Sequence, residues 1–262
     1  MPILNSIAAS NVGKVRESNE DNFFLNGKTL NGKTQGTAIE SHQTKDGLFA
    51  VCDGMGGEAQ GELAAAIAVI SLGEYYYQAL KQERAFDKWF GDYVMKANAQ
   101  ICAEIEKNSG KRMGTTFAVL SIQDQQAYSA NIGDSRVYLF RGGQIRQLSK
   151  DHTQARRLID MGILTEEEGK THPERHKLTQ HLGIFPEEMI IEPFFAPPVQ
   201  LEAGDVFLLC SDGLTDMVED EEIQEILSRH ENPRDAARSL MDIALENGGK
   251  DNVSLIISKV CH

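Results

Sequence analysis

The sequence predicts an α+β protein in which antiparallel β-sheets are stacked in a sandwich, with α-helices packed outside. Two observations lead to this fold class. Runs of branched and aromatic residues, which are typical of strands, recur along the chain, and two long stretches have helical character. These elements are grouped, with strands first, then two helices, then a meander of strands and finally mixed elements. Grouping of this kind favours antiparallel sheets over the alternating βαβ pattern of parallel ones.

The predicted strands are short apolar runs bounded by turn residues. They are Gly47–Cys52, Thr115–Ile122, Ala127–Ile132, Arg136–Phe140, Val206–Cys210 and Val253–Val260. The pair Gly142-Gly143 lies between the segments YLFR and QIRQL and predicts a hairpin turn.

The first predicted helix, Glu58–Leu80, contains the Ala-rich segment LAAAIAVISL, and Phe86–Lys107 is predicted to be the second. Asn232 followed by proline predicts a helix start, with the helix continuing to about Glu246. Thr165 and Glu168 have the spacing of a capping box. That pair falls in an otherwise irregular segment, 154–192, which we call the flap and expect to form a surface subdomain.

Composition limits the choice of partners. The 262 residues include 26 Lys+Arg and 39 Asp+Glu, for a net charge of -13. The sign of this charge argues against nucleic acid or an anionic membrane as the main partner and suits metal cations or basic protein segments. The alternative reading is that the charge serves only ordinary acidic solubility. No linker or repeat divides the chain, so we expect one domain over residues 1–262.

The sequence gives no sign of export or membrane insertion. It has no apolar run of 18 residues and no secretory signal at its start. None of the four cysteines lies in a C-x-x-C pair, and Cys52 and Cys210 end apolar runs, as buried small hydrophobes do. We expect a reduced, cytoplasmic monomer.

Three patterns match motifs of other functions, but the sequence around each does not fit the structure that the motif requires. Gly27–Thr34 matches a P-loop, but polar residues follow it where a helix is required, so we expect a hairpin tip or exposed loop. Gly54–Ala59 matches a loose dinucleotide pattern, but Asp53 would oppose a pyrophosphate and another helix follows the first. Pro173 interrupts the helical spacing of three histidines that are candidates for zinc: His172, His176 and His181.

Several carboxylates share one position, directly after or before an apolar strand-like run. They are Glu20, Asp21, Asp53, Asp134, Asp212 and Asp251. Any single Asp-Gly after a strand is usually a turn, because Asp caps its own backbone and Gly accepts a positive φ. Together at the rim of one sandwich, however, these groups would repel one another unless cations neutralised them.

Hard cations such as Mg²⁺ and Mn²⁺ take oxygen ligands. Two of them about 3.5–4 Å apart can clamp a phosphoryl group and lower the pKa of a water towards neutrality. Such a site also needs an arginine that grips phosphate oxygens, and Arg16 lies a few residues before Glu20. Alone, Arg16 would be read as a surface salt-bridge residue.

The order of these motifs is recognisable. G-x-x-R-x-x-N-E-D, D-G-x-G-G, G-D-S-R, S-D-G-L and D-N occur in turn at Gly13–Asp21, Asp53–Gly57, Gly133–Arg136, Ser211–Leu214 and Asp251-Asn252. So arranged, they resemble the metal-dependent protein phosphatases, the PPM family of type 2C, in its bacterial branch. M-G-T-T at Met113–Thr116 and K-D-H-T at Lys150–Thr153 are similar to further segments of that family. The resemblance covers about Ser10–Val260.

The resemblance implies two antiparallel sheets flanked by helices, a four-layer α-β-β-α sandwich with the metals at one edge. It also implies hydrolysis of phosphoserine and phosphothreonine in proteins by a metal-activated water, without a covalent enzyme intermediate. The substrates would be phosphorylated proteins, and the enzyme would oppose a Ser/Thr kinase. The flap matches a variable segment beside the cleft, where substrates are selected.

Carried over by position, the resemblance assigns Asp53 as the bridge between two Mn²⁺ or Mg²⁺ ions and Gly54 as a backbone carbonyl ligand. Asp212 and Asp251 would bind one ion. The remaining assignments are Glu20 and Asp21 as holders of metal waters, Arg16 as the phosphate ligand, Asp134 with Asp212 at a third ion, and Asn252 as a supporting residue.

One position departs from the pattern. Many relatives carry after D-G a histidine that is proposed to protonate the leaving group, whereas this chain has Met55, which transfers no proton. We expect activity to survive, with a metal-bound water as the acid. Two alternatives to a protein phosphatase stay open: an enzyme for small phosphate esters, and an inactive relative that binds phosphoproteins.

Overall fold

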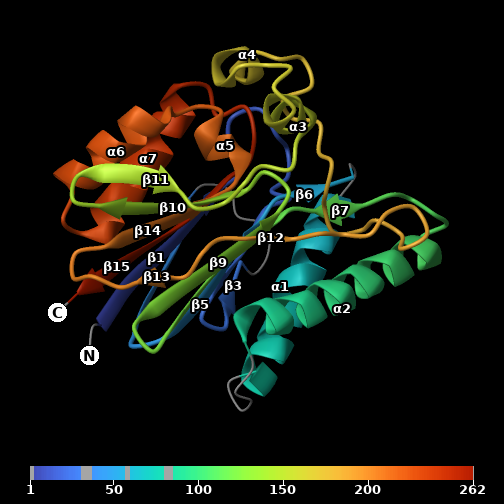
Figure 1. Cartoon of the computed structure of the whole chain (residues 1–262), viewed down its shortest axis with the longest axis horizontal. Helices are drawn as coiled ribbons and strands as arrows, with labels where there is room; N and C mark the ends of the chain where they lie inside the picture. The colour runs from blue at the N-terminus through green and yellow to red at the C-terminus, as the bar shows by residue number, and fades with distance from the viewer. Residues whose placement is uncertain (1–2, 31–36, 57–59, 80–84, 262) are drawn as a thin grey trace.

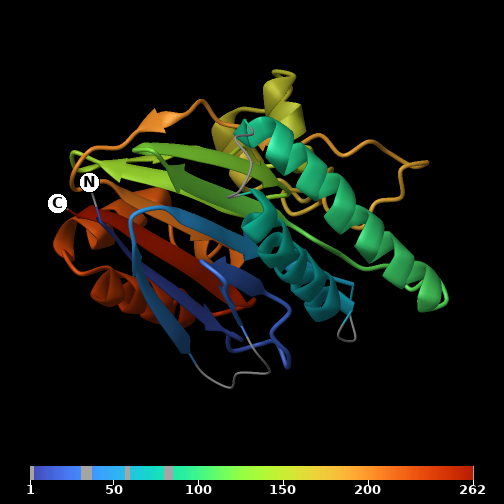
Figure 2. The ribbon, with the colours of Figure 1, turned by 90° about the horizontal axis from the view of Figure 1, so that it is seen from below.

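The computed structural model describes residues 3–30, 37–56, 60–79 and 85–261. Two β-sheets lie face to face, and helices cover the outer side of each (Figures 1 and 2). The predicted α+β sandwich with four layers is confirmed. No helix in the described ranges is both long and apolar enough to cross a bilayer.

Among the described residues, six strands form the first sheet, in the order β11-β10-β14-β15-β1-β4. All of its neighbouring pairs are antiparallel. The strands are β1 (Ile3–Asn11), β4 (Ala38–Thr44), β10 (Arg136–Arg141), β11 (Gln144–Gln147), β14 (Val206–Cys210) and β15 (Val253–Cys261).

The second sheet follows the order β12-β9-β8-β5-β2-β3, with β13 also paired to β9. Its strands are β2 (Asn22–Leu25), β3 (Lys28–Thr29), β5 (Gly47–Cys52), β8 (Phe117–Gln123), β9 (Gln126–Ile132), β12 (Phe194–Phe195) and β13 (Val199–Gln200). A separate small ladder joins β6 (Gly54–Met55) to β7 (Gly114–Thr115).

The strands β5 and β14 are apolar throughout because both of their faces are covered. In β5, Phe49 and Val51 point into the core between the sheets. The alternating residues Leu48, Ala50 and Cys52 point to the opposite face and belong to the core under the helices. In β14, Phe207 and Leu209 enter the same central core. This double burial explains why these runs were visible in the sequence.

The helices divide between the two outer layers. α1 (Gln60–Ala79) and α2 (Phe86–Lys107) cover the second sheet, and α6 (Asp220–Arg229) and α7 (Pro233–Glu246) cover the first. The short α5 (Asp212–Thr215) precedes α6. Side-chain caps confirm two predicted starts: Asn232 accepts from the backbone N–H of Arg234, and Thr165 forms a capping box with Glu168.

Three sequence predictions of structure were incomplete or wrong. Ala38–Thr44 lies in the polar stretch after the P-loop match, where a hairpin tip or exposed loop was expected. It is the edge strand β4, whose polar side chains are compatible with an edge that meets solvent. β1 escaped notice because two of its buried positions are serines, paired with serines of β15. The flap contains two short helices, α3 (Gln154–Asp160) and α4 (Glu166–Lys170), and is therefore less irregular than expected.

The two nucleotide-binding patterns lie in unsuitable structure. Lys28 and Thr29 of the P-loop match form β3, which pairs with β2, and the rest of that match, from residue 31, is outside the described residues. In the dinucleotide match, Gly54 and Met55 form β6; residues 57–59 are outside the described residues, and α1 is followed by α2. A βαβ unit is therefore not formed there.

Candidate active site

The strand register brings the predicted carboxylates together. In the second sheet Asn22 pairs with Cys52, so Asp21 and Asp53 are neighbours at one sheet edge. In the first sheet Cys210 pairs with both Arg136 and Leu255, which places the segments carrying Asp134, Asp212 and Asp251 at the corresponding edge. The two edges lie on the same side of the sandwich, because Asp53 from the second sheet lines one cavity together with Asp134, Asp212 and Asp251 from the first.

A cavity of about 590 Å³ opens at this edge. Its lining includes the following predicted residues: Arg16, Glu20, Asp53, Gly54, Asp134, Asp212, Asp251 and Asn252. Asp21 is not part of this lining and is only 2% exposed, but its charge is near enough to raise the pKa of Asp53. The structure therefore unites every site residue that the sequence analysis named.

Asp53 is at the centre of the negative charge. Burial, followed by repulsion from Asp212, Asp21 and Asp134, raises the pKa of Asp53 well above its usual range. Burial and repulsion from Asp212 also raise the pKa of Asp134 well above its usual range. These carboxyls are ionised together only if positive charge enters the site.

Asp21 and Asp212 also need nearby positive charge to favour their ionised forms. Burial raises the pKa of Asp21 to about 7, although a hydrogen bond from the Ser211 hydroxyl, 2.8 Å long, lowers it. Burial and then repulsion from Asp216 raise the pKa of Asp212 to about 6. The Oδ1 atoms of Asp21 and Asp212 are buried and accept no hydrogen bond from any described residue.

Crowded carboxylates with unpartnered oxygens fit divalent cations. The donor set consists of oxygens, which Mg²⁺ and Mn²⁺ prefer, and the cavity retains room for their waters. A cation would supply both the missing charge and the missing partners of the orphaned oxygens. On these grounds the residues fit the metal centre that the motifs predict.

The backbone of Asp53 is fixed by the M-G-T-T segment. Its N–H donates to the Thr116 hydroxyl, and its carbonyl oxygen accepts from the Thr116 N–H and the Thr115 hydroxyl, each at 2.9 Å. At the next position, a Cβ would collide with the carbonyl oxygens of Gly61 and Glu20. Glycine at 54 is therefore a steric requirement of the site.

Asn252 joins the arginine-bearing segment to the core. Its side-chain amide donates to the carbonyl oxygens of Val12 and Ser18, both at 2.9 Å, and its Oδ1 accepts from the Glu20 N–H at 2.8 Å. These three bonds hold the loop on which Arg16 stands. The predicted supporting role of Asn252 thus has a geometric basis.

Arg16 reaches across the mouth of the cavity. Its Nη2 donates to Asp251 Oδ2 at 2.6 Å, and this hydrogen bond raises the pKa of Arg16 further. Burial raises the pKa of Glu20, and the nearby Arg16 charge opposes that rise. The Arg16 side chain is 55% exposed, so the guanidinium is open to an anionic ligand.

Two residues of this region were not named as partners by the sequence analysis. Among the described residues, His176 groups with Asp212 and Asp216 as potential metal ligands, and not with His172 or His181. A zinc site of the three histidines is therefore not formed. Asp216 lies outside every motif, and only its spacing of four residues from Asp212 signals that both share one helical face.

Two stacked antiparallel sheets with a carboxylate-lined cavity and an arginine at one edge define a metal-dependent phosphohydrolase. The chain belongs to the protein phosphatase 2C family, whose model matches residues 36–246. The resemblance seen in the motifs is thereby confirmed.

Known phosphatases are similar to this chain, in sequence and in structure, over nearly its whole length. PhpP of Streptococcus pneumoniae, a protein phosphatase, is 34% identical over 251 residues, which are 95% of this chain and 94% of that protein. The crystal structure of PstP, a serine/threonine phosphatase of Mycobacterium tuberculosis, matches with a TM-score of 0.81 and 32% identity, covering 99% of this chain and 100% of that one. A structure of the PstP catalytic domain with two manganese ions matches with a TM-score of 0.78, 31% identity and complete coverage of both chains.

Proposed function

We propose that this chain hydrolyses phosphoserine and phosphothreonine in proteins at the cavity between the sheet edges. The observation that carries the proposal is the convergence of strand-end carboxylates with one open arginine in a single cavity. Family membership and the serine/threonine phosphatase names of the relatives support it.

Two divalent cations would be held by Asp53 in common, with the Gly54 carbonyl on one ion and Asp212 and Asp251 on the other. Glu20 and Asp21 would accept hydrogen bonds from metal waters. The mutual repulsion of Asp134 and Asp212 supports a third ion between them. When bound, the cations neutralise the phosphate and lower the pKa of the attacking water.

Arg16 has a separate role in this proposal. Its guanidinium would release Asp251 once a cation occupies that carboxylate, and would donate to the phosphate oxygens of the substrate. Met55 also lines the cavity but has no proton to give to the leaving oxygen. We infer that the chain needs no histidine at position 55.

The biological setting is also proposed. We infer that residues 1–262 act as one phosphatase domain, with the flap beside the cavity as the substrate-selecting segment. The substrates would be phosphorylated proteins, including those of a Ser/Thr kinase that the enzyme opposes in the cytoplasm, and the enzyme would act as a monomer. The in vivo ion is Mn²⁺ or Mg²⁺.

The proposal is tested by phosphate release from a phosphothreonine peptide with and without Mn²⁺. We expect release that requires the ion, disappears in Asp53→Asn and persists in Asp242→Asn, a matched change on the exposed face of α7. Faster turnover of a small phosphate ester than of the peptide would favour the small-ester enzyme. Peptide binding without any release would favour an inactive phosphoprotein-binding relative.

A further inference from the structure

Two histidines from the flap, His176 and His181, line the active-site cavity. Hydrolysis of a phosphoserine or phosphothreonine needs a proton on the leaving oxygen, because an alkoxide is a poor leaving group. Met55 lines the same cavity and carries no such proton. Histidine is the side chain whose ordinary pKa lies nearest neutrality, so these two residues are the first candidates for the donor.

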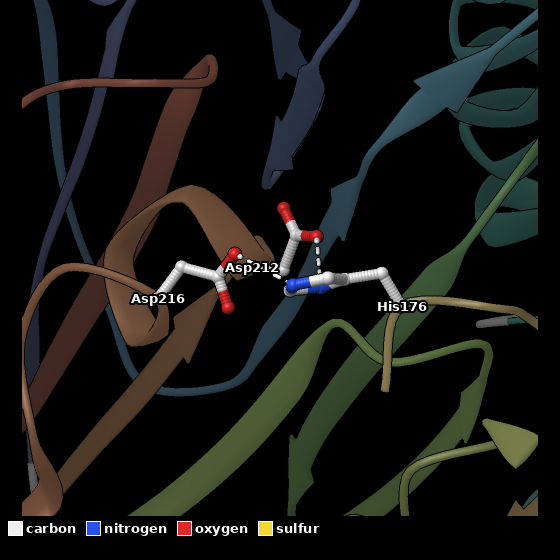
Figure 3. A group of neighbouring side chains, drawn as sticks. All are labelled: His176, Asp212 and Asp216. Atoms are coloured by element: carbon white, nitrogen blue, oxygen red, sulfur yellow. Dashed lines mark ion pairs between the residues drawn. The ribbon is translucent and has the colours of Figure 1, made fainter. Parts of the chain in front are cut away.

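His176 is occupied by carboxylates. Its imidazole lies between Asp212 and Asp216, with Nδ1 3.9 Å from Asp212 Oδ2 and Nε2 3.5 Å from Asp216 Oδ2 (Figure 3). Both of its nitrogens therefore face acidic groups of the core. This leaves His181 as the cavity histidine with a nitrogen available to the substrate.

A hydrogen bond fixes the ring of His181 and its tautomer. Nδ1 lies 2.8 Å from the carbonyl oxygen of Leu182, and because a carbonyl oxygen only accepts, Nδ1 carries the hydrogen. Nε2 makes no hydrogen bond with a described residue and is not among the buried polar atoms that lack a partner, so solvent reaches it. This nitrogen can take up a proton and pass it on.

The backbone beside His181 is tied to the centre of the site. Leu182 and Thr115 exchange two backbone hydrogen bonds, 2.9 and 3.1 Å long, and the Thr115 hydroxyl donates to the Asp53 carbonyl oxygen. Thr115 is also the ladder partner of Gly54. The small ladder that carries the proposed ligand Gly54 therefore also holds the histidine.

The imidazole of His181 fills the space beside Met55. Gly114 is the ladder partner of Met55, and cross-strand partners direct their side chains to the same face. A Cβ at Gly114 would lie 2.6 Å from His181 Nδ1. The ring thus occupies the place that a side chain at position 114 would take, next to the side chain of Met55.

The surroundings of His181 make its protonated form a stronger acid than an ordinary histidine. Burial lowers the pKa of His181 from 6.5, the hydrogen bond with Leu182 raises it, Arg112 lowers it and Glu188 raises it. Arg112 and Glu188 are paired with each other, with Nη1 2.9 Å from Oε2, so their effects oppose. Burial therefore decides the direction, and the imidazolium gives up its proton readily.

We propose that His181 is the general acid that protonates the leaving oxygen of the substrate. As water attacks phosphorus, the P–O bond to the serine or threonine breaks, and the electron pair of that bond takes the proton from His181 Nε2. The ring is left neutral, with its hydrogen on Nδ1, and regains a proton from solvent before the next turnover. The inference rests on the proposed function and adds a catalytic residue to it.

The test compares two substrates in Mn²⁺ that differ in their need for a proton. p-Nitrophenyl phosphate releases a stable phenolate, whereas a phosphothreonine peptide releases an alcohol. His181→Gln retains an amide donor for the Leu182 carbonyl oxygen, and it should lower kcat for the peptide by about 100-fold, at least 10 times more than for p-nitrophenyl phosphate. His172→Ala, a change of a flap histidine outside the cavity lining, should alter neither rate.

Two further readouts are specific to a proton donor beside Met55. In the wild type, the peptide rate relative to the p-nitrophenyl phosphate rate should fall as the pH rises from about 6 to 8, because the imidazolium is lost, and His181→Gln should abolish this fall. Adding Met55→His to His181→Gln returns an imidazole to the neighbouring position and should recover about 10-fold of the lost peptide rate. A double variant without recovery would contradict the placement beside Met55.

The outcomes separate this inference from the proposed function. Equal losses with both substrates in His181→Gln, or no loss with the peptide, would overturn the inference and leave the phosphatase standing, with a metal-bound water as the acid. A wild type that hydrolyses neither substrate would overturn both. Independently of hydrolysis, ¹⁵N NMR of the metal-free protein should show neutral His181 with its hydrogen on Nδ1, and a hydrogen on Nε2 would also overturn the inference.

Discussion

Replacing Asp21 with asparagine should stabilise the metal-free protein at pH 8, although the same residue is needed when metal is present. Asp21 is 2% exposed, and burial raises its pKa from 3.8 to about 7. The difference, 7 minus 3.8, is about three pKa units, which corresponds to about 4 kcal/mol of lost stability when the carboxyl must ionise in the folded state.

The net gain should be smaller than this. Asparagine keeps an oxygen for the Ser211 hydroxyl but brings an amide N–H₂, which needs an acceptor, to the place of Oδ1, which makes no hydrogen bond with any described residue. A buried amide without a partner costs about 1–3 kcal/mol, so we expect Asp21→Asn to raise the free energy of unfolding by about 1–3 kcal/mol.

The sign of the pH dependence follows from the raised pKa. Below pH 3.8 both folded and unfolded Asp21 are protonated, and the penalty is absent. It grows as pH rises from about 4 to about 7 and is complete above that, so metal-free wild type should lose stability over this window. Urea unfolding in a chelator at pH 5 and pH 8 measures the effect. A mutant less stable than wild type at pH 8, or one with an unchanged pH slope, would refute the reasoning.

Three further substitutions at the site, and one control in α2, have defined outcomes. Arg16→Ala should lower kcat/KM for a phosphothreonine peptide by about 10- to 100-fold, because charge-assisted hydrogen bonds to the phosphate are lost. It should change the free energy of unfolding by less than about 1 kcal/mol, because the ion pair of Arg16 with Asp251 is exposed. Steady-state kinetics that show no loss would contradict the role of Arg16. Gly54→Ala should abolish activity and lower the melting temperature because its Cβ meets backbone, whereas Gly91→Ala, with open space in α2, should stabilise by up to about 1 kcal/mol. Asn252→Ala removes three hydrogen bonds and should cost about 2–4 kcal/mol in urea unfolding; a loss below 1 kcal/mol would mean that the loop is held by other contacts.

The strands most readily predicted from sequence are those in which consecutive residues are all apolar. β5 and β14 are apolar at every position because each is covered on both faces, and such runs need no knowledge of distant partners. β1 is buried as well, but Ser6 and Ser10 satisfy their hydroxyls on Ser258 and Ser254, more than 240 positions away. A single sequence does not reveal that pairing.

The candidate site divides in the same way. Asp53 and Asp212 follow recognisable strands, so a common edge could be predicted once antiparallel sheets were expected. The contact of His176 with Asp216 could not, because the flap has no periodicity that fixes its position over the core. Antiparallel register, seen only in the folded chain, explains why Asp21 and Asp53 end side by side.

Counting bound Mn²⁺ ions by calorimetry in wild type and Asp53→Asn tests the central claim most directly. If Asp53 is the carboxylate shared by two cations, wild type should bind at least two ions tightly, and Asp53→Asn should weaken both together. An unchanged stoichiometry with unchanged affinities in Asp53→Asn would show that the strand-end carboxylates do not form a centre around this residue.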